Sequence, residues 1–273
     1  MIKQAIIPLA GLGTRMLPLT SVMPKELLPI NGKPNIEHIM DECIEAGIKK
    51  FIFIISKDKK SIKEYFSKDK LYKKAIKKKK DQQIINAYKK IKRYKKMIKF
   101  VYQNKPLGTG DAVLRCTKYL KGNYFLMLLP DDLIIKKNCS KEMINLFKKK
   151  KSSIIATKKV NKKTVSRWGI LSVKNKKKNY FQISDVVEKP SLKQAKSNFA
   201  IIGRYILPIK IMKELKKLKP GQGGEIHITD AIRNLIFSGE KFFASIFKGK
   251  YLDCGTLKGY IKSGIEISRI KNL

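Results

Sequence analysis

The side chains best suited to chemistry lie in loops that directly follow short apolar runs. The residues Gly11-Leu12-Gly13-Thr14-Arg15 follow the apolar run 4–9, and Pro24-Lys25-Glu26-Leu27-Leu28-Pro29 come shortly after them. Glycines allow backbone N–H groups to approach a phosphate, and a guanidinium offers paired donors to phosphate oxygens. The first loop matches neither common phosphate-binding pattern, because position 16 is Met instead of Gly and no Gly-Lys pair is followed by Ser or Thr. Since a glycine turn after a strand is common in α/β proteins, the loops alone do not define a function.

Charged residues also follow later apolar runs. Pro130-Asp131-Asp132 comes after 124–129, Glu188-Lys189-Pro190 comes after 183–187, and Asp253 stands in Leu252-Asp253-Cys254-Gly255. On their own these residues are equally typical of surface turns. The motifs contain no Ser/His/Asp arrangement for nucleophilic catalysis. We therefore expect chemistry that depends on positioning and charge neutralisation instead of a protein nucleophile.

Strand-like and helix-like patterns alternate around these loops. We expect strands at 4–9, 50–56, 98–103, 124–129, 153–157, 170–173 and 183–187, and helices at 35–46, 110–119, 210–218, 228–237 and from 257 onward. Four prolines between positions 18 and 34 prevent a long helix before residue 35. The alternation predicts an α/β chain with a three-layer α/β/α, Rossmann-like fold and a mainly parallel mixed sheet. No repeat or flexible linker interrupts it, so we expect a single domain over residues 1–273.

Residues 57–99 differ from the rest of the chain. They are dense in lysine, carry scattered Tyr and Ile, and contain neither Gly nor Pro. This composition predicts a basic helical insertion between two strands, with a solvated helical face as the simplest interpretation. The alternative is a contact between subunits, formed by the apolar side chains of Leu71, Tyr72, Ile84, Ile85, Tyr88 and Ile91.

The chain is strongly basic, with 62 Lys and Arg against 21 Asp and Glu in 273 residues, a net charge of +41. Such a charge is compatible with a polyanionic partner. Only seven of the basic residues are arginine, however, and nucleic-acid recognition depends heavily on arginine. We therefore expect no specific nucleic acid. A nucleic-acid-binding function stays as an alternative, and it predicts affinity that falls steeply with salt and survives loss of Lys189.

The cysteines and hydropathy bear on where the chain works. The four cysteines, Cys43, Cys116, Cys139 and Cys254, form no CxxC pair, which argues against a zinc site or a disulfide framework. No apolar run approaches the roughly 20 residues that cross a bilayer, so we expect no membrane contact. The N-terminal apolar run breaks at Pro8 and is not typical of a signal peptide. These features favour a reduced, cytoplasmic chain.

The two first loops together resemble a known signature, GxGTRxxPxT followed by PKExLP, of the sugar-1-phosphate nucleotidyltransferase family. The resemblance continues through Leu129-Pro130-Asp131, Glu188-Lys189-Pro190, the segments 198–207 and 224–232, and Leu252-Asp253-Cys254-Gly255. Within the family, the chain is most similar to bacterial members that use UTP and glucose 1-phosphate. The resemblance implies transfer of the uridylyl group of UTP to α-D-glucose 1-phosphate, which gives UDP-glucose and pyrophosphate. It also implies a Mg²⁺ cofactor and a homodimer or homotetramer.

The resemblance also implies roles for individual residues. Arg15, Lys25 and Lys189 would be the catalytic cations: Arg15 for the leaving phosphates, Lys25 for the α-phosphate and Lys189 for the phosphate of the sugar. Asp131 and Asp253 would bind the metal ion. The remaining positions fall into two sets. The nucleotide would be bound by Ala10, Gly11, Gly13, Thr14, Glu26, Gln103 and Gly108, and the sugar by Gly169, Glu188 and Gly203. Arg204 and Arg233 are expected to form structural ion pairs.

One segment departs from the family pattern. Uridylyl-transferring members usually carry Gly-Leu-Gly-His-Ala where this chain reads Gly108-Thr109-Gly110-Asp111-Ala112. The departure leaves open a different base or sugar 1-phosphate, for example dTTP. A weakly active regulatory paralogue is a further alternative, although every charged position of the expected site is occupied.

Overall fold

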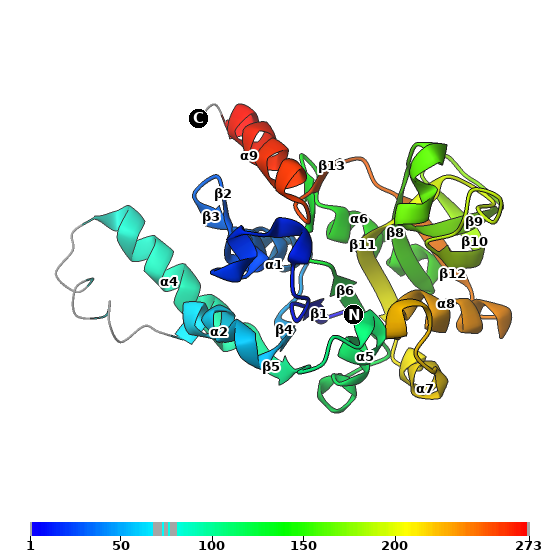
Figure 1. The fold of residues 1–273 in the computed structure, drawn as a ribbon, viewed down its shortest axis with the longest axis horizontal. Helices are drawn as coiled ribbons and strands as arrows, with labels where there is room; N and C mark the ends of the chain where they lie inside the picture. Colours follow the sequence, from blue (N-terminus) through cyan, green and yellow to red (C-terminus); the bar gives the residue numbers. More distant parts are fainter. Residues whose placement is uncertain (1, 68–72, 74–75, 77–80, 272–273) are drawn as a thin grey trace.

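A central sheet with helices on both faces forms the body of the protein (Figure 1). The computed structural model describes residues 2–67, 73, 76 and 81–271. In this part of the chain nine strands form one sheet, in the order β5-β4-β1-β6-β11-β8-β12-β10-β9. Their bounds are β1 (Gln4–Pro8), β4 (Lys50–Ile55), β5 (Ile98–Tyr102), β6 (Tyr124–Leu128), β8 (Ser153–Lys159), β9 (Gly169–Lys174), β10 (Tyr180–Glu188), β11 (Phe199–Pro208) and β12 (Phe242–Ile246). Two small ribbons pair β13 (Lys250–Asp253) with β7 (Asp132–Ile135), and β2 (Pro29–Ile30) with β3 (Lys33–Pro34).

The sheet is mixed, and most of its strands share one direction. The pairs β5–β4, β4–β1 and β1–β6 are parallel, as is β8–β12. The strands β11 and β10 are antiparallel to their neighbours. Two of the nine strands of this sheet therefore oppose the other seven. The predicted α/β class with a mainly parallel mixed sheet is confirmed.

Side chains alternate between two apolar layers, one on each face of the sheet. In β4, Phe51 and Phe53 pack into one layer, whereas Ile52 and Ile54 pack into the other. The first layer includes apolar side chains of α1 (Asn35–Glu45), α2 (Lys60–Ser67), α4 (Gln82–Met97), α6 (Cys139–Lys150) and α9 (Leu257–Lys271). The second includes those of α5 (Gly108–Leu114), α7 (Ile211–Lys217) and α8 (Ile228–Phe237). Because both faces of the central strands are covered, these strands read as continuous apolar runs.

Several elements were not expected from the sequence. These are β7, α6, β11, β12 and β13, and the predicted helix at 110–119 is shorter, since α5 ends at Leu114 and a 3-10 turn follows at Thr117–Tyr119. In α6 the Asn138 side chain caps the first turn by accepting a hydrogen bond from the Lys141 N–H. All ten residues of β11 are buried. Gly203 and Arg204 lie inside that strand and lower its β-propensity, so the sequence does not indicate a strand there. Both residues pack beside the functional residues.

The segment 57–99 contains helical elements on either side of the residues outside the described range. It holds a 3-10 turn at Lys57–Lys59, then α2 and α4. Asp41 of α1 anchors α4, because it accepts hydrogen bonds from the Tyr94 hydroxyl and from Lys90 Nζ. Leu71 and Tyr72 of the suggested subunit contact lie outside the described residues. On α4 the Ile84 side chain is exposed, and the others, Ile85, Tyr88 and Ile91, are partly buried. Among the described helices, none has the length and apolar character to cross a bilayer.

Candidate active site

Two cavities open beside the ends of β1 and β6, and they share Leu129 and Asp131. The Gln103 cavity has a volume of about 240 Å³ and is lined by Pro8, Ala10, Gly11, Lys25, Glu26, Gln103, Pro106, Gly108, Thr109, Ala112, Leu129, Pro130, Asp131 and Glu225. The Glu188 cavity has a volume of about 360 Å³ and is lined by Arg15, Leu129, Asp131, Asp132, Arg167, Trp168, Gly169, Glu188, Lys189, Ile201, Gly203, Tyr205, Tyr251 and Asp253. β1 and β6 are parallel neighbours, so the loops that follow them meet at one edge of the sheet.

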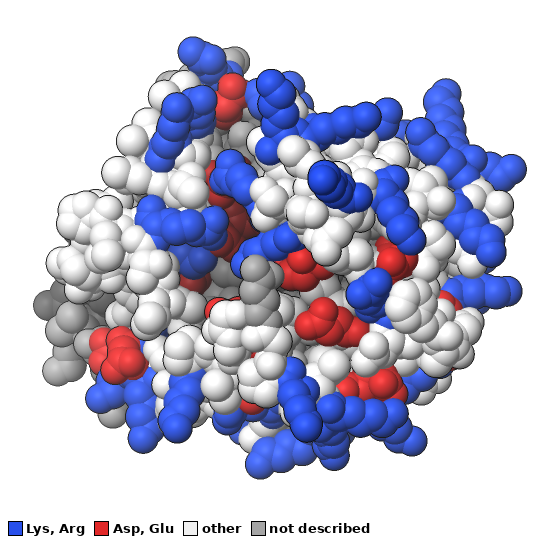
Figure 2. All heavy atoms as spheres, turned by 45° about the vertical axis from the view of Figure 1, so that its right-hand side comes forward, with Lys and Arg blue, Asp and Glu red and all other residues white. Residues whose placement is uncertain are grey.

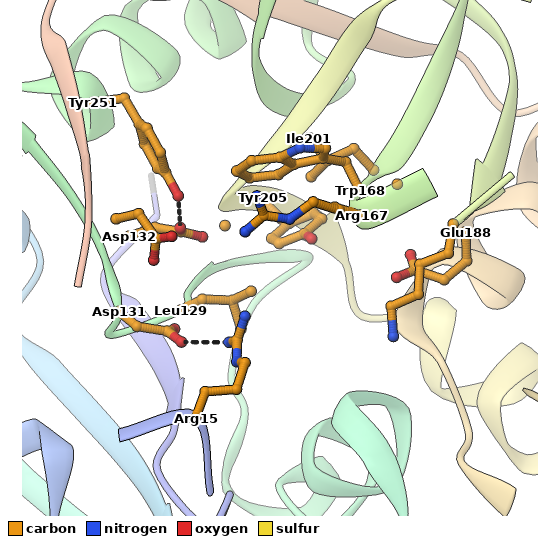
Figure 3. A pocket seen from close by; sticks show the side chains of 14 residues that line it. Arg15, Leu129, Asp131, Asp132, Arg167, Trp168, Glu188, Ile201, Tyr205 and Tyr251 are labelled. Atoms are coloured by element: carbon orange, nitrogen blue, oxygen red, sulfur yellow. Dashed lines mark hydrogen bonds and ion pairs between the residues drawn. The ribbon is translucent and has the colours of Figure 1, made fainter. Parts of the chain in front are cut away.

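The two basic loops meet the acidic strand end at Asp131. Lys25 lies in the 3-10 turn Lys25–Leu27, and its Nζ is 2.7 Å from Asp131 Oδ2. An Arg15 side-chain nitrogen is 3.6 Å from the same oxygen (Figure 3). Burial alone would raise the pKa of Asp131, but the Lys25 ammonium outweighs it and the pKa is lowered. The Lys25 pKa is raised, because Asp131 and Glu26 outweigh its burial. Both groups are therefore charged at neutral pH.

Three carboxylates gather around this point. An added Cβ on Gly255 would lie 2.7 Å from Asp131 Oδ2 and 3.3 Å from Asp253 Oδ1, so both oxygens face the same small space. The Tyr251 hydroxyl donates to Asp132 Oδ1 at 2.6 Å, as Figure 3 shows. Burial, followed by the nearby Asp131 charge, raises the pKa of Asp132 to about 7. Two oxygens of two carboxylates, in a space that glycine keeps free, suit a hard divalent cation that completes its shell with phosphate oxygens and water.

A buried ion pair fixes the loop that carries Asp131. Arg204 of β11 is 0% exposed, and its Nη2 lies 2.9 Å from Glu42 Oε2 of α1. Its guanidinium also donates to the carbonyl oxygens of Leu129 at 3.0 Å and of Asp132 at 2.5 Å. The residues on both sides of Asp131 are therefore held from within the core. The expected ion pair of Arg204 is confirmed, as is that of Arg233, which lies 2.9 Å from Asp185 Oδ1.

Replacing Glu42 with Ala is expected to lower the free energy of unfolding by about 3–5 kcal/mol, because the change leaves the Arg204 charge buried without its partner. Urea unfolding of the purified variant measures this loss. Glu45→Ala is the matched control on the same helix, since Glu45 is exposed and accepts a hydrogen bond from Asn138 Nδ2 at 3.1 Å. A loss below about 1 kcal/mol for Glu42→Ala would show that the pair does not hold this loop.

The residues expected to bind the nucleotide are found mostly in the Gln103 cavity. Ala10, Gly11, Glu26, Gln103 and Gly108 all line it. Glu26 is 1% exposed, and both of its carboxylate oxygens accept from Lys59 Nζ, at 2.9 and 2.8 Å. Burial lowers the pKa of Lys59, although Glu26 opposes the shift. The carboxylate of Glu26 is thus already paired with Lys59 within the protein. A ligand in the cavity can therefore contact the Glu26 backbone or the outer side of this ion pair.

Two of the expected nucleotide-binding residues lie outside the lining of either cavity. These are Gly13 and Thr14, which belong to the turn that presents Arg15. Gly13 has a φ of +74°, in the left-handed region that glycine adopts without strain. Its carbonyl oxygen accepts from the Thr20 hydroxyl at 3.0 Å. In this structure the two residues shape the loop and do not face the cavities.

The residues expected to bind the sugar line the Glu188 cavity. Glu188 ends β10 opposite Gly169 of β9, and a Cβ on Gly169 would lie 3.1 Å from Glu188 Oε2. The Thr229 hydroxyl donates to the same Oε2 at 3.1 Å. A Cβ on Gly203 would lie 2.7 Å from Leu129 Cβ and would overlap the Asp132 carboxylate. These glycines therefore make room for the acidic side chains as well as for a ligand.

Lys189 directly follows Glu188 in the chain and has an uncommon backbone conformation. Its φ is +44°, and its N–H donates to the Trp168 carbonyl oxygen at 3.0 Å. A left-handed conformation in a residue other than glycine costs free energy, and such residues cluster at functional sites. The turn brings Lys189 to the cavity lining, beside Glu188.

Seven further residues line the Glu188 cavity that were not assigned a role from the sequence, two of them the apolar Leu129 and Ile201. The other five are aromatic or charged: Asp132, Arg167, Trp168, Tyr205 and Tyr251. Figure 3 shows the Arg167 guanidinium reaching between Tyr205 and Asp132. Arg167 and Trp168 directly precede Gly169, so proximity in sequence could have found them. Tyr205 comes from β11, which was not expected as a strand, and only the fold places it here.

Charge is distributed unevenly over the face of the molecule turned forward in Figure 2. Lysine and arginine side chains surround a hollow in which acidic side chains lie. A basic rim raises the local concentration of anionic ligands, whereas acidic groups at the centre suit a cation or sugar hydroxyls. The arrangement favours a ligand that combines phosphate, a divalent cation and a polar group.

The comparisons with known proteins agree with this geometry. The model of the family described as "Nucleotidyl transferase" matches residues 4–269. UTP–glucose-1-phosphate uridylyltransferase of Mycoplasma pneumoniae is 36% identical over 97% of this chain and 91% of its own length, and that of Bacillus subtilis is 35% identical over 98% and 91%.

Solved structures give the same result. UDP-glucose pyrophosphorylase complexed with UDP-glucose has a TM-score of 0.87 at 35% identity and covers 98% of this chain and 99% of its own. A UTP-bound UGPase from Acinetobacter baumannii has a TM-score of 0.87 at 32% identity and covers 98% and 94%. The resemblance seen in the motifs is confirmed over nearly the whole chain, and the chain belongs to the nucleotidyl transferase family.

Proposed function

We propose that this chain transfers the uridylyl group of UTP to α-D-glucose 1-phosphate and releases UDP-glucose and pyrophosphate. The observation that carries the proposal is the pair of cavities that meet at Asp131. A nucleoside diphosphate sugar has two bulky ends joined by a diphosphate, which matches two cavities joined at a charged centre. Relatives at about 35% identity over nearly the full length carry the name of this activity.

The reaction needs no protein nucleophile. A phosphate oxygen of glucose 1-phosphate forms a bond to the α-phosphorus of UTP, and the bond from that phosphorus to the bridging oxygen of pyrophosphate breaks. The electron pair leaves with pyrophosphate. Because the attacking oxygen is already anionic, no general base is required, and catalysis rests on alignment and charge neutralisation.

The cations of the site fit the places where negative charge changes. Lys25 lines the Gln103 cavity and contacts Asp131, which lines both cavities, and there it would neutralise the α-phosphate. Arg15 lies beside it with its side chain 63% exposed, so it is free to turn toward the leaving phosphates. Lys189 lines the Glu188 cavity, where it would bind the phosphate of the sugar. Glu188, an acceptor when ionised, would bind two sugar hydroxyls.

Mg²⁺ is the cofactor that the donor set fits best. Asp131 and Asp253 would hold it, since their oxygens face the space that Gly255 leaves free. No group of three or more His, Cys, Asp or Glu side chains suited to a metal occurs among the described residues. Two carboxylates leave the other coordination positions of a hard cation to the substrate's phosphates and to water. When bound, the ion would draw negative charge from the phosphate oxygens.

The proposal also covers the cellular location and the oligomeric state. All four cysteines are free and buried, which fits a reduced cytoplasm. We propose a homodimer or homotetramer, supported by exposed apolar side chains on two helices, Ile84 of α4 and Ile261 and Ile265 of α9. Light scattering of the purified chain is expected to give two or four times its mass of 31.3 kDa. A mass equal to that of one chain would contradict the assembly.

Release of pyrophosphate tests the proposed reaction. The purified chain is incubated with Mg²⁺, glucose 1-phosphate and, in separate assays, UTP, dTTP, CTP, ATP or GTP. We expect turnover to be fastest with UTP. A clear preference for dTTP would reject the assignment of the base, and turnover with another hexose 1-phosphate in place of glucose 1-phosphate would reject that of the sugar. No release with any pair would reject the reaction itself.

A further inference from the structure

Asp111, one of the two residues that depart from the family pattern in 108–112, takes part in a buried network next to the Gln103 cavity. Asp111 lies in the first turn of α5 and is 9% exposed. Its Oδ2 accepts from Arg115 Nε at 2.7 Å and from Gln103 Nε2 at 2.8 Å, and its Oδ1 accepts from Arg115 Nη2 at 3.3 Å. Gln103 lines the cavity, whereas Asp111 is not part of the lining. Asp111 therefore contacts the cavity lining through its hydrogen bond with Gln103.

The network determines the orientation of the Gln103 side-chain amide. Its Nε2 donates to the Gly108 carbonyl oxygen at 3.0 Å as well as to Asp111. Both partners are acceptors, and a side-chain amide has two N–H donors, so both donors are used. An amide turned by 180° would set its oxygen against two other oxygens. The two acceptors therefore favour the orientation in which the nitrogen faces Asp111 and Gly108.

The side-chain oxygen Oε1 of Gln103 is therefore the atom that is available to a ligand in the cavity. An acceptor at this place matches the N3–H donor of a uracil or thymine ring. Cytosine carries a lone pair at N3 in place of a hydrogen, so the same oxygen would meet an acceptor and both would stay unpaired. A site built around such a hydrogen bond discriminates strongly against an analogue that lacks the donor.

We propose that Asp111, held by Arg115, is a positioning residue that locks the Gln103 amide with its oxygen toward the base and so selects uracil over cytosine. This inference rests on the proposed function, because it takes the Gln103 cavity as the site of the base. It explains how a chain that departs from the usual Gly-Leu-Gly-His-Ala sequence retains a defined hydrogen-bonding edge. Arg115 supplies the charge that keeps the carboxylate in place on its own helix, four residues away.

The test compares kcat/KM for UTP and CTP, with glucose 1-phosphate held constant. We expect the unaltered chain to prefer UTP by about 100-fold or more. Asp111→Leu removes the acceptor and is expected to lower that ratio about tenfold, because the amide is then held only by the Gly108 carbonyl. Asp111→Asn keeps one oxygen that can accept from Nε2 and is expected to retain most of the preference. The KM for glucose 1-phosphate is expected to stay unchanged in both variants.

The outcomes separate this inference from the proposed function. An unchanged UTP to CTP ratio in an active Asp111→Leu protein overturns the inference and leaves the reaction intact. Equal use of UTP and CTP by the unaltered chain also overturns it. Preference for dTTP over UTP would leave it standing, since thymine has the same N3–H, while rejecting the proposed base. If Asp111→Leu does not fold, Asp111→Ala is measured in its place, and we expect the same roughly tenfold fall of the UTP to CTP ratio. The ratio in the unaltered chain tests the inference without any variant.

Discussion

Asp131→Asn is expected to lower kcat by about 10²- to 10³-fold while the protein stays folded. Asp131 lines both cavities, and its carboxylate contacts both basic loops. An amide cannot supply the negative charge that a divalent cation requires, and it no longer attracts Lys25 to the junction. Pyrophosphate release at saturating UTP and glucose 1-phosphate measures the loss, and circular dichroism with thermal melting confirms the fold.

A second measurement shows whether the loss concerns the metal ion. For Asp131→Asn we expect the Mg²⁺ concentration that gives half-maximal rate to rise at the same time as kcat falls. Asp58→Asn, which changes an exposed carboxylate that lines neither cavity, is the control and is expected to behave as the unaltered chain. Near-normal turnover of Asp131→Asn with an unchanged Mg²⁺ dependence would rule out the proposed role of Asp131.

Lys189→Ala is expected to lower kcat/KM for glucose 1-phosphate by about 10- to 100-fold, the usual effect of losing a hydrogen bond to a charged group. The effect on kcat/KM for UTP is expected to be clearly smaller, because Lys189 lines the Glu188 cavity and not the Gln103 cavity. Initial rates with each substrate varied in turn, and equilibrium binding of UTP alone, separate the two effects.

The control for this variant is Lys193→Ala. Lys193 is an exposed lysine four residues further along that lines neither cavity, so its loss changes the net charge equally. If general attraction of anions by the basic surface were the cause, both lysine variants would lose activity to the same degree, and more at low salt. Equal damage to the use of UTP and glucose 1-phosphate by Lys189→Ala would also contradict its assignment.

Much of the architecture follows from local sequence. The apolar runs at β1, β4 and β6 are long enough for buried strands, and the helical spacing of Ile36, Ile39 and Cys43 predicts α1. The loops that carry Arg15, Lys25 and Asp131 follow from those strands, because neighbouring parallel strands end at one edge of the sheet. The residues that line the two cavities could therefore largely be named from motifs.

The features that could not be predicted from the sequence depend on contacts between residues that are far apart in the chain. Glu42 and Arg204 are far apart in the chain, and nothing in the pattern around either one indicates that they pair inside the core. The same holds for Lys59, which lies at the start of the basic segment and yet occupies both oxygens of Glu26. Gln103 could be chosen as a contact to the base, but the direction of its amide depends on Asp111 and Gly108.

A crystal structure with UDP-glucose and Mg²⁺ tests the central claim most directly. We expect the uracil in the Gln103 cavity, the glucose in the Glu188 cavity, and the diphosphate between them beside Asp131 and Lys25. Density for the nucleotide away from residues 10–15, or with the sugar in the Gln103 cavity, would contradict it.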